Sequence, residues 1–290
     1  MSNKDLLDNI KKLRELTGVG FKDCKSALDE SNGNIEKSIE FLRKKGIAKA
    51  SKKMSRTASE GLALVKEHSN KVSIIEINSE TDFVARDDNF LAFSKDVLNL
   101  AFANSDADVD ALLSSGVEDL REKLVQKIGE NVNVRRVDRL KFDNADQGIV
   151  ESYVHSNNRI AVLISLKGGD EALARDIAMH IAAVNPMVVR PEDVPEEVLA
   201  KESEIYSAQA RESGKPEEII EKMISGRLRK FISEVSLLEQ PFVKDPEIKI
   251  SALLKESGAD IVNFVRYEVG EGIEKEEEDF AAEVAAQLNN

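Results

Sequence analysis

Several residue types are scarce or missing in this chain of 290 residues, and each absence narrows its possible function. There is no tryptophan, a single cysteine (Cys24) and only three histidines. One cysteine excludes an internal disulfide and is typical of proteins in a reducing compartment. Zinc-site spacings such as Cys-x-x-Cys do not occur. The sequence therefore predicts neither a disulfide-stabilised fold nor a metal centre, and we expect Cys24 to be a buried structural thiol.

Long apolar runs are missing as well. None approaches the roughly 20 residues that a membrane-spanning helix requires. The first residues, Met1-Ser-Asn-Lys-Asp-Leu-Leu-Asp8, lack the apolar stretch of a signal peptide, and their acidic residues are unlike an organellar transit peptide. We therefore expect a cytoplasmic protein that does not contact a membrane.

Motifs for catalysis and for nucleotide binding are also missing. Gly18 and Gly20 follow no predicted strand and have no Walker lysine, so they do not predict a phosphate-binding loop. Neither a nucleophile elbow nor a kinase motif set occurs, and nothing marks acidic neighbours such as Asp87 and Asp88 as a catalytic pair. His180, in an apolar helix, is expected in the core. The sequence predicts no catalytic residues and no cofactor.

Acidic residues outnumber basic ones, 54 to 41, for a net charge of −13. This surplus argues against a general nucleic-acid binder. The N-terminal region is the exception, because basic residues predominate there. We interpret residues 46–60, which are small, polar and basic, as a linker that is helical in part. Nucleic-acid binding is the alternative for this segment, although it has no aromatic residue to stack on a base.

Residues 1–45 predict three short helices, each with one apolar face. The breaks between these helices are predicted at Thr17-Gly-Val-Gly20 and Ser31-Asn-Gly-Asn34. Such a three-helix bundle resembles a ubiquitin-associated-type domain, which is a binding module.

An internal repeat organises the next part of the chain. Residues 61–70 align with residues 148–157, and an apolar strand follows each segment. Helical residues 96–103 then align with 176–183. We therefore predict an α+β core of two subdomains, each with helices against a small, mostly antiparallel sheet. The subdomains span residues 61–147 and residues 148–192 with 239–269.

An inserted arm is predicted at residues 193–238, as helices Glu196–Arg211 and Glu217–Leu238 joined by a tight turn. Apolar residues of the second helix recur at alternating steps of four and three, the spacing of a coiled coil. They are Ile224, Leu228, Phe231, Val235 and Leu238. The short turn favours an antiparallel arm within the chain over a zipper between copies. Residues 270–290 predict a final amphipathic helix, which docks on its own domain or on a partner.

The segment Thr81-Asp82-Phe83-Val84 joins a predicted strand to a predicted helix. β-Branched residues from 72 to 77 form the strand, and the helix is expected to start with Asp88 or Asn89 as its N-cap. Neither periodicity assigns Phe83 to the core, and the second repeat lacks these residues. Phe83 either folds back on its own domain or fills a pocket of a partner, and the repeat favours the partner.

These residues have a known counterpart, because Thr81-Asp-Phe-Val-Ala-Arg86 resembles the signature of the bacterial elongation factor Ts family. Further matches are Leu13-Arg-Glu-Leu-Thr-Gly-Val-Gly20, Asp23-Cys-Lys25, Ile128-Gly-Glu-Asn-Val-Asn-Val-Arg-Arg136, Ala178-Met-His-Ile-Ala-Ala183 and Arg266-Tyr-Glu-Val-Gly-Glu-Gly-Ile-Glu-Lys275. That family exchanges guanine nucleotide on the translational GTPase elongation factor Tu. The resemblance implies that Asp82 and Phe83 disturb the magnesium and phosphate site of the GTPase, with Thr81 and Val84 shaping the loop.

The resemblance also implies secondary contacts with the GTPase, at Phe21, His155, Phe280 and Val284. Relatives carry an apolar pair after Thr-Gly-x-Gly, where this chain has Phe21-Lys22. The alternative interpretation is an adaptor whose three-helix head recruits a protein without exchanging nucleotide. An enzyme is a more distant third reading, and the oligomeric state is left open.

Overall fold

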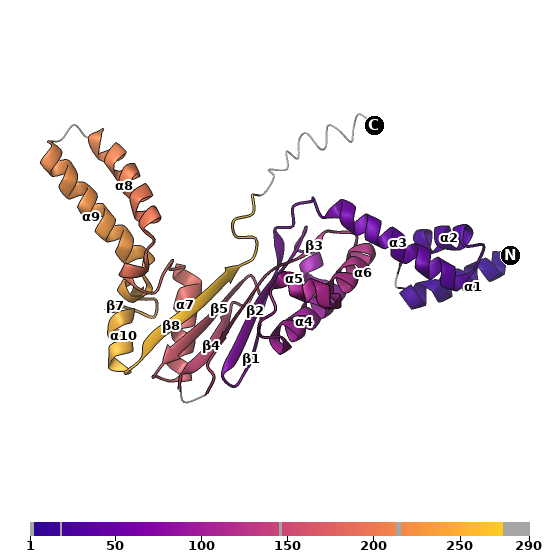
Figure 1. Cartoon of the computed structure of the whole chain (residues 1–290), viewed down its shortest axis with the longest axis horizontal. Coiled ribbons are helices and arrows are strands. Elements are labelled where there is room, and N and C mark those ends of the chain that lie inside the picture. The colour runs from indigo at the N-terminus through magenta and orange to yellow at the C-terminus, as the bar shows by residue number, and fades with distance from the viewer. Residues whose placement is uncertain (1–2, 18, 145–146, 213–215, 275–290) are drawn as a thin grey trace. The chain divides into compact units, whose positions relative to one another are not determined.

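The computed structural model describes residues 3–17, 19–144, 147–212 and 216–274 (Figure 1). They divide into two compact units. Of these described residues, unit 1 contains those up to 64, those from 75 to 137 and those from 268 to 274, and unit 2 contains those from 65 to 74 and from 138 to 267. Both units combine helices with small sheets, which confirms the predicted α+β class. The final helix predicted at residues 270–290, with its residues Phe280 and Val284, lies almost entirely outside the described residues.

Unit 1 begins with three helices, α1 (Asn3–Thr17), α2 (Phe21–Glu30) and α3 (Ile35–Lys53). These helices and the break between α1 and α2 share one cluster of buried apolar residues, made of Ile10, Leu13, Val19, Cys24, Ala27, Leu28 and Leu42. The Cys24 thiol is fully buried and donates a hydrogen bond to the carbonyl of Val19 at 3.4 Å, so the prediction of a structural thiol is confirmed. Helix α3 continues through the first half of the basic segment 46–60.

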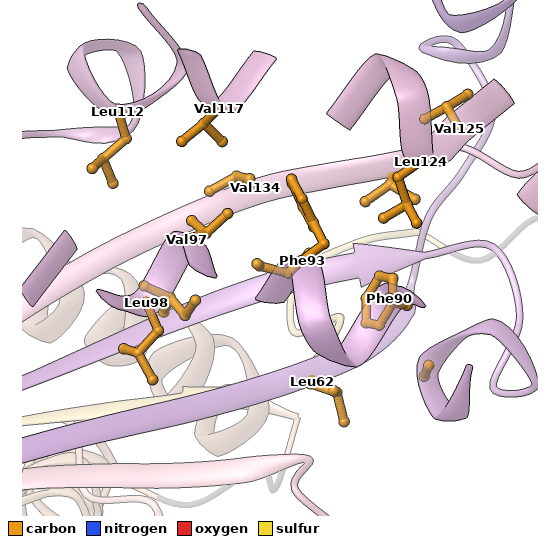
Figure 2. Packing of buried hydrophobic residues seen from close by; sticks show 14 of the residues in the cluster. Leu62, Phe90, Phe93, Val97, Leu98, Leu112, Val117, Leu124, Val125 and Val134 are labelled. Atoms are coloured by element: carbon orange, nitrogen blue, oxygen red, sulfur yellow. The ribbon is translucent and has the colours of Figure 1, made fainter. Parts of the chain in front are cut away.

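Strands β1 (Glu60–His68), β2 (Lys71–Ser79) and β3 (Val132–Lys141) form one sheet in that order. The sequence between β2 and β3 forms α4 (Asp88–Ala103), α5 (Val109–Leu112) and α6 (Glu118–Ile128). Figure 2 shows apolar side chains from these helices and strands gathered in one cluster. Among them are Phe90, Phe93, Val97, Leu124 and Val134.

Two sequence-based details of this region are wrong. Helix α4 is capped by Asp87, one residue before the predicted cap, and the Asp87 side chain accepts hydrogen bonds from the backbone N–H groups of Asn89 and Phe90. In α6, the sequence spacing places Leu120, Leu124 and Ile128 on one apolar face, yet Leu120 is 40% exposed while Leu124 is buried. Arg121 is buried instead, because its guanidinium donates to the Val132 carbonyl at 3.0 Å.

Unit 2 contains a second sheet with the order β4-β5-β8, formed by β4 (Ile149–Val154), β5 (Ile160–Lys167) and β8 (Asp260–Glu268). Helix α7 (Glu171–Val184) packs against it and contains His180. As predicted, this histidine is fully buried, and its Nε2 lies 3.0 Å from Oε1 of Gln240.

A small element group after the arm was missing from the sequence prediction. It consists of β6 (Pro241–Phe242), β7 (Asp245–Lys249) and α10 (Ile250–Glu256). These segments are too short to show a periodicity of their own.

The arm consists of α8 (Glu196–Arg211) and α9 (Glu217–Val235), which run antiparallel and side by side (Figure 1). Arg227 of α9 lies over the Tyr206 ring of α8 at 5.7 Å and donates to Gln209 at 2.6 Å. The two helices of the arm therefore pack against each other within the chain. Helix α9 is shorter than predicted, because the chain forms a separate 3-10 turn at residues 237–239 that includes Leu238.

Candidate functional site

The Phe83 loop, residues 80–87, connects β2 to α4 in unit 1. Phe83 is 81% exposed, whereas the next two residues, Val84 and Ala85, are buried in the core cluster. The residues that directly follow Phe83 therefore pack in the core, while the Phe83 ring itself lies in solvent. The prediction that Phe83 lies outside its own core is confirmed.

The loop is held by short-range hydrogen bonds. Val84–Arg86 form a 3-10 turn, in which the N–H of Asp87 donates to the Val84 carbonyl at 3.0 Å. The carbonyl of Phe83 accepts from the N–H of Arg86 at 3.1 Å, and the Thr81 carbonyl accepts from the hydroxyl of Ser79 at 2.9 Å. An aromatic side chain on a backbone fixed in this way has a defined direction before it meets a partner.

A second set of bonds ties the loop to the turn between α6 and β3. The carboxylate of Glu130 accepts from the N–H of Thr81 at 3.0 Å and from its hydroxyl at 2.7 Å. In return, the carboxylate of Glu80 accepts from the N–H of Asn131 at 2.6 Å. The two segments therefore exchange carboxylate hydrogen bonds in both directions.

Asp82 stands beside the exposed ring. Its carboxylate accepts from the guanidinium of Arg86 at 2.9 Å, and the Arg86 side chain is largely exposed while that of Asp82 is about half exposed. Ion pairs of this kind contribute little to stability. The Asp82 carboxylate can therefore change partners at small cost when another molecule approaches.

Asp87 fixes the far end of the loop. The side-chain amide of Asn89, followed by the backbone N–H groups of Asn89 and Phe90, lowers the pKa of the Asp87 carboxyl. The carboxylate is consequently ionised as the cap of α4, where negative charge at a helix N-terminus is favourable.

The remaining predicted contact residues are distant from this loop in the sequence. Phe21, at the start of α2, is 48% exposed. His155, in the turn between β4 and β5 of unit 2, is exposed, and its Nδ1 lies 3.0 Å from Oδ1 of Asn157. A groove of about 510 Å³ opens next to it. Residues lining the groove include Tyr153, Ile160, Met179, Val243 and Arg266.

Sequence reasoning missed a buried carboxylate in unit 1, that of Glu76 on β2. It is fully buried and accepts from Arg135 at 3.0 Å, from Arg136 at 2.5 Å and from the N–H of Gly270 at 2.8 Å. Burial raises the pKa of Glu76, but the bonds from Gly270 and Asn78 and the charge of Arg136 outweigh it and lower the pKa overall. Two features of the sequence could have indicated this buried ion pair. They are a glutamate within an Ile-Ile-Glu-Ile strand and a pair of adjacent arginines.

Within the described ranges, no group of three or more histidine, cysteine, aspartate or glutamate side chains is placed to hold a metal ion. The same part of the chain contains no helix with the length and apolar character needed to cross a bilayer.

Comparison with known proteins decides the family. The model of the family described as elongation factor TS matches residues 80–271, more than half of the chain. A curated protein named elongation factor Ts, from Hahella chejuensis, is 58% identical over 281 residues, which cover 96% of both chains. Proteins of that name from Marinobacter nauticus and Teredinibacter turnerae are each 57% identical, over 96% of this chain and 95% of theirs.

The chain belongs to the elongation factor Ts family. The resemblance in the sequence motifs is therefore confirmed, and membership places the chain among the elongation factors of protein biosynthesis. It also supports a role in nucleotide exchange. The match to the elongation factor Ts model begins at Glu80, the first residue of the Phe83 loop, while the relatives extend the similarity over nearly the whole chain.

Proposed function

We propose that this protein is a guanine nucleotide exchange factor for elongation factor Tu. It binds the GDP-loaded GTPase and promotes release of GDP so that GTP rebinds. The exposed Phe83, on a hydrogen-bonded loop of a chain from the elongation factor Ts family, is the observation that carries the proposal. A protein that binds the nucleotide-free GTPase more tightly than the loaded form must, by thermodynamic linkage, weaken nucleotide binding.

The Phe83 ring acts as the anchor, since a rigid exposed aromatic gains most by entering an apolar pocket. Asp82 then lies next to the magnesium and phosphate site of the GTPase. There its carboxylate competes with the ligands of the magnesium ion and repels the phosphates of the nucleotide. Thr81 and Val84 hold the loop in shape. The nucleotide and its magnesium belong to the GTPase, so this chain forms no covalent bond and acts without a cofactor.

Further contacts follow the family. Phe21 on the three-helix bundle and the C-terminal residues Phe280 and Val284 grip the GTPase domain, while His155 and its neighbouring groove meet the third domain of the partner. The groove is apolar on most of its wall and carries Lys244 and Arg266 at its side. Binding at separate segments lets one protein hold the GTPase while the Phe83 loop enters it.

Release of fluorescent GDP from the GTPase tests the proposal. We expect the full-length protein to accelerate release in stopped-flow measurements, in proportion to its concentration until the complex saturates. The adaptor alternative predicts binding with an unchanged release rate. Measuring complex formation alongside release therefore separates exchange factor from adaptor.

Asp82→Ala should slow GDP release by about tenfold, a barrier change of about 1.4 kcal/mol, while weakening binding to the nucleotide-free GTPase much less. The carboxylate acts on the magnesium site, which is empty of nucleotide in that complex. Arg86→Ala is the matched control, because it removes the ion pair but keeps the Asp82 carboxylate. Two results would contradict this role. One is that Asp82→Ala reduces the release rate and the binding affinity by the same factor, and the other is that Arg86→Ala reduces the release rate as much as Asp82→Ala does.

The arm is expected to be dispensable for most of the exchange. Replacing residues 196–233 with a short Gly-Ser turn should cost less than about tenfold in release rate, or 1.4 kcal/mol, because α8 and α9 pack chiefly on each other. Val235 is kept, since its carbonyl accepts from Met187 at 2.8 Å. A larger loss with an unchanged melting temperature would show that the arm is a principal contact.

A further inference from the structure

We infer that Glu130 and Glu80 are positioning residues that hold Phe83 in its binding direction, an inference that rests on the proposed function. Glu130 accepts two hydrogen bonds from Thr81, and Glu80 accepts one from the N–H of Asn131. We call this reciprocal arrangement the carboxylate clamp, made of residues 80–81 and 130–131.

The clamp reaches a third segment through Asn131. The Asn131 side-chain amide donates to the Arg56 carbonyl at 2.8 Å, and the Arg56 guanidinium lies 3.4 Å from the Glu80 carboxylate. Asn131 is buried, and Gly129 just before the clamp ends α6 in the left-handed conformation at φ +89°. The clamp thus joins the chain before β1, the Phe83 loop and the end of α6, which are distant in sequence.

Each bond of the clamp has a carboxylate oxygen as acceptor, and hydrogen bonds to carboxylates are stronger than those between neutral groups. They act at the start of the loop, whereas the 3-10 turn and the buried Val84 secure the residues after Phe83. With both sides fixed, little backbone entropy is lost when the ring enters a pocket. Without the clamp, the loop would have to be ordered during binding, and nucleotide release would slow although the ring is intact.

A double-mutant cycle tests this inference. In the wild-type background, Glu130→Ala should slow GDP release by about tenfold, an effect that is comparable to the interaction energies of residues in one hydrogen-bond network. In the Phe83→Ala background the same change should cost less than about twofold, since the clamp has no ring left to position. Asp110→Ala, which removes an exposed carboxylate on α5 outside the clamp, is the control and should leave release unchanged.

The outcomes separate the inference from the function on which it rests. If Phe83→Ala exchanges at the wild-type rate, the proposed function fails. If Phe83→Ala is slow while Glu130→Ala is not, or if Glu130→Ala costs the same factor in both backgrounds, the clamp has no positioning role. Glu130→Gln, which keeps one carbonyl acceptor, should restore part of the rate and guards against a variant that does not fold.

A readout without the GTPase completes the test. The chain has no tryptophan, so Phe83→Trp introduces a single reporter at the site. We expect Glu130→Ala or Glu80→Gln in this background to increase the fast local motion of the indole in time-resolved anisotropy, with Asp110→Ala as the unchanged control. Identical decays in all of these proteins would overturn the inference.

Discussion

Phe83→Ala is expected to slow GDP release from the GTPase by about thirtyfold, which corresponds to about 2 kcal/mol, the loss typical of a hot-spot aromatic. The melting temperature should stay nearly unchanged, because the ring is 81% exposed and contributes little to its own core. Release is followed by stopped flow with labelled GDP and stability by circular dichroism. The combination of lost exchange and retained stability is what marks a binding residue.

Phe90→Ala is the matched control for this variant. Phe90 is the same residue type seven positions later, but it is fully buried in the unit 1 core (Figure 2). Its truncation should cost about 3 to 5 kcal/mol of stability through the lost burial and the cavity it leaves. Should Phe83→Ala instead melt as low as Phe90→Ala, or exchange at the wild-type rate, the loop is structural.

Glu76→Ala is expected to cost about 3 to 5 kcal/mol in the free energy of unfolding, a loss as large as that of Phe90→Ala. The substitution leaves Arg135 and Arg136 without their buried carboxylate and the N–H of Gly270 without its acceptor. Urea denaturation measures the loss. Glu40→Ala is the control, because the Glu40 side chain pairs with Lys44 at a largely exposed site and its loss should change stability far less.

The same carboxylate predicts a pH dependence. The pKa of Glu76 is lower in the folded protein than in the unfolded chain, where it is about 4.3. Its contribution is therefore fully present above the unfolded pKa and is lost as pH falls through the folded pKa. Between about pH 4.3 and the folded pKa, the wild type should lose more stability than Glu76→Gln. Parallel pH profiles for the two proteins would contradict the assignment.

Local patterns were enough to predict most of the elements, because burial imposes a period of two on strands and of 3.6 on helices. The exposure of Phe83 was predictable for the same reason: it fits neither period, and the second repeat folds without it. The paired arm helices followed from the heptad spacing of α9 and its short turn.

Interactions between distant segments could not be predicted in this way. The spacing did not predict that Leu120 is exposed and Arg121 is buried. Arg121 is buried because its guanidinium donates a hydrogen bond to the Val132 carbonyl of β3, and no residue near α6 in the sequence indicates this partner. The same holds for Glu76, whose partner Gly270 is 194 residues away, and for Glu130, which is 49 residues from Thr81. Residues that support the site were therefore harder to find than the exposed residue they support.

The central claim is that the Phe83 side chain moves from solvent into the GTPase, and the environment of position 83 tests it most directly. Phe83→Trp, labelled with 5-fluorotryptophan in this chain alone, gives one fluorine resonance because the sequence has no other tryptophan. In the free protein, the account predicts a clear difference in the chemical shift of that resonance between H₂O and D₂O. In the nucleotide-free complex, this solvent-dependent difference should disappear. A solvent shift that is the same in both states would contradict it.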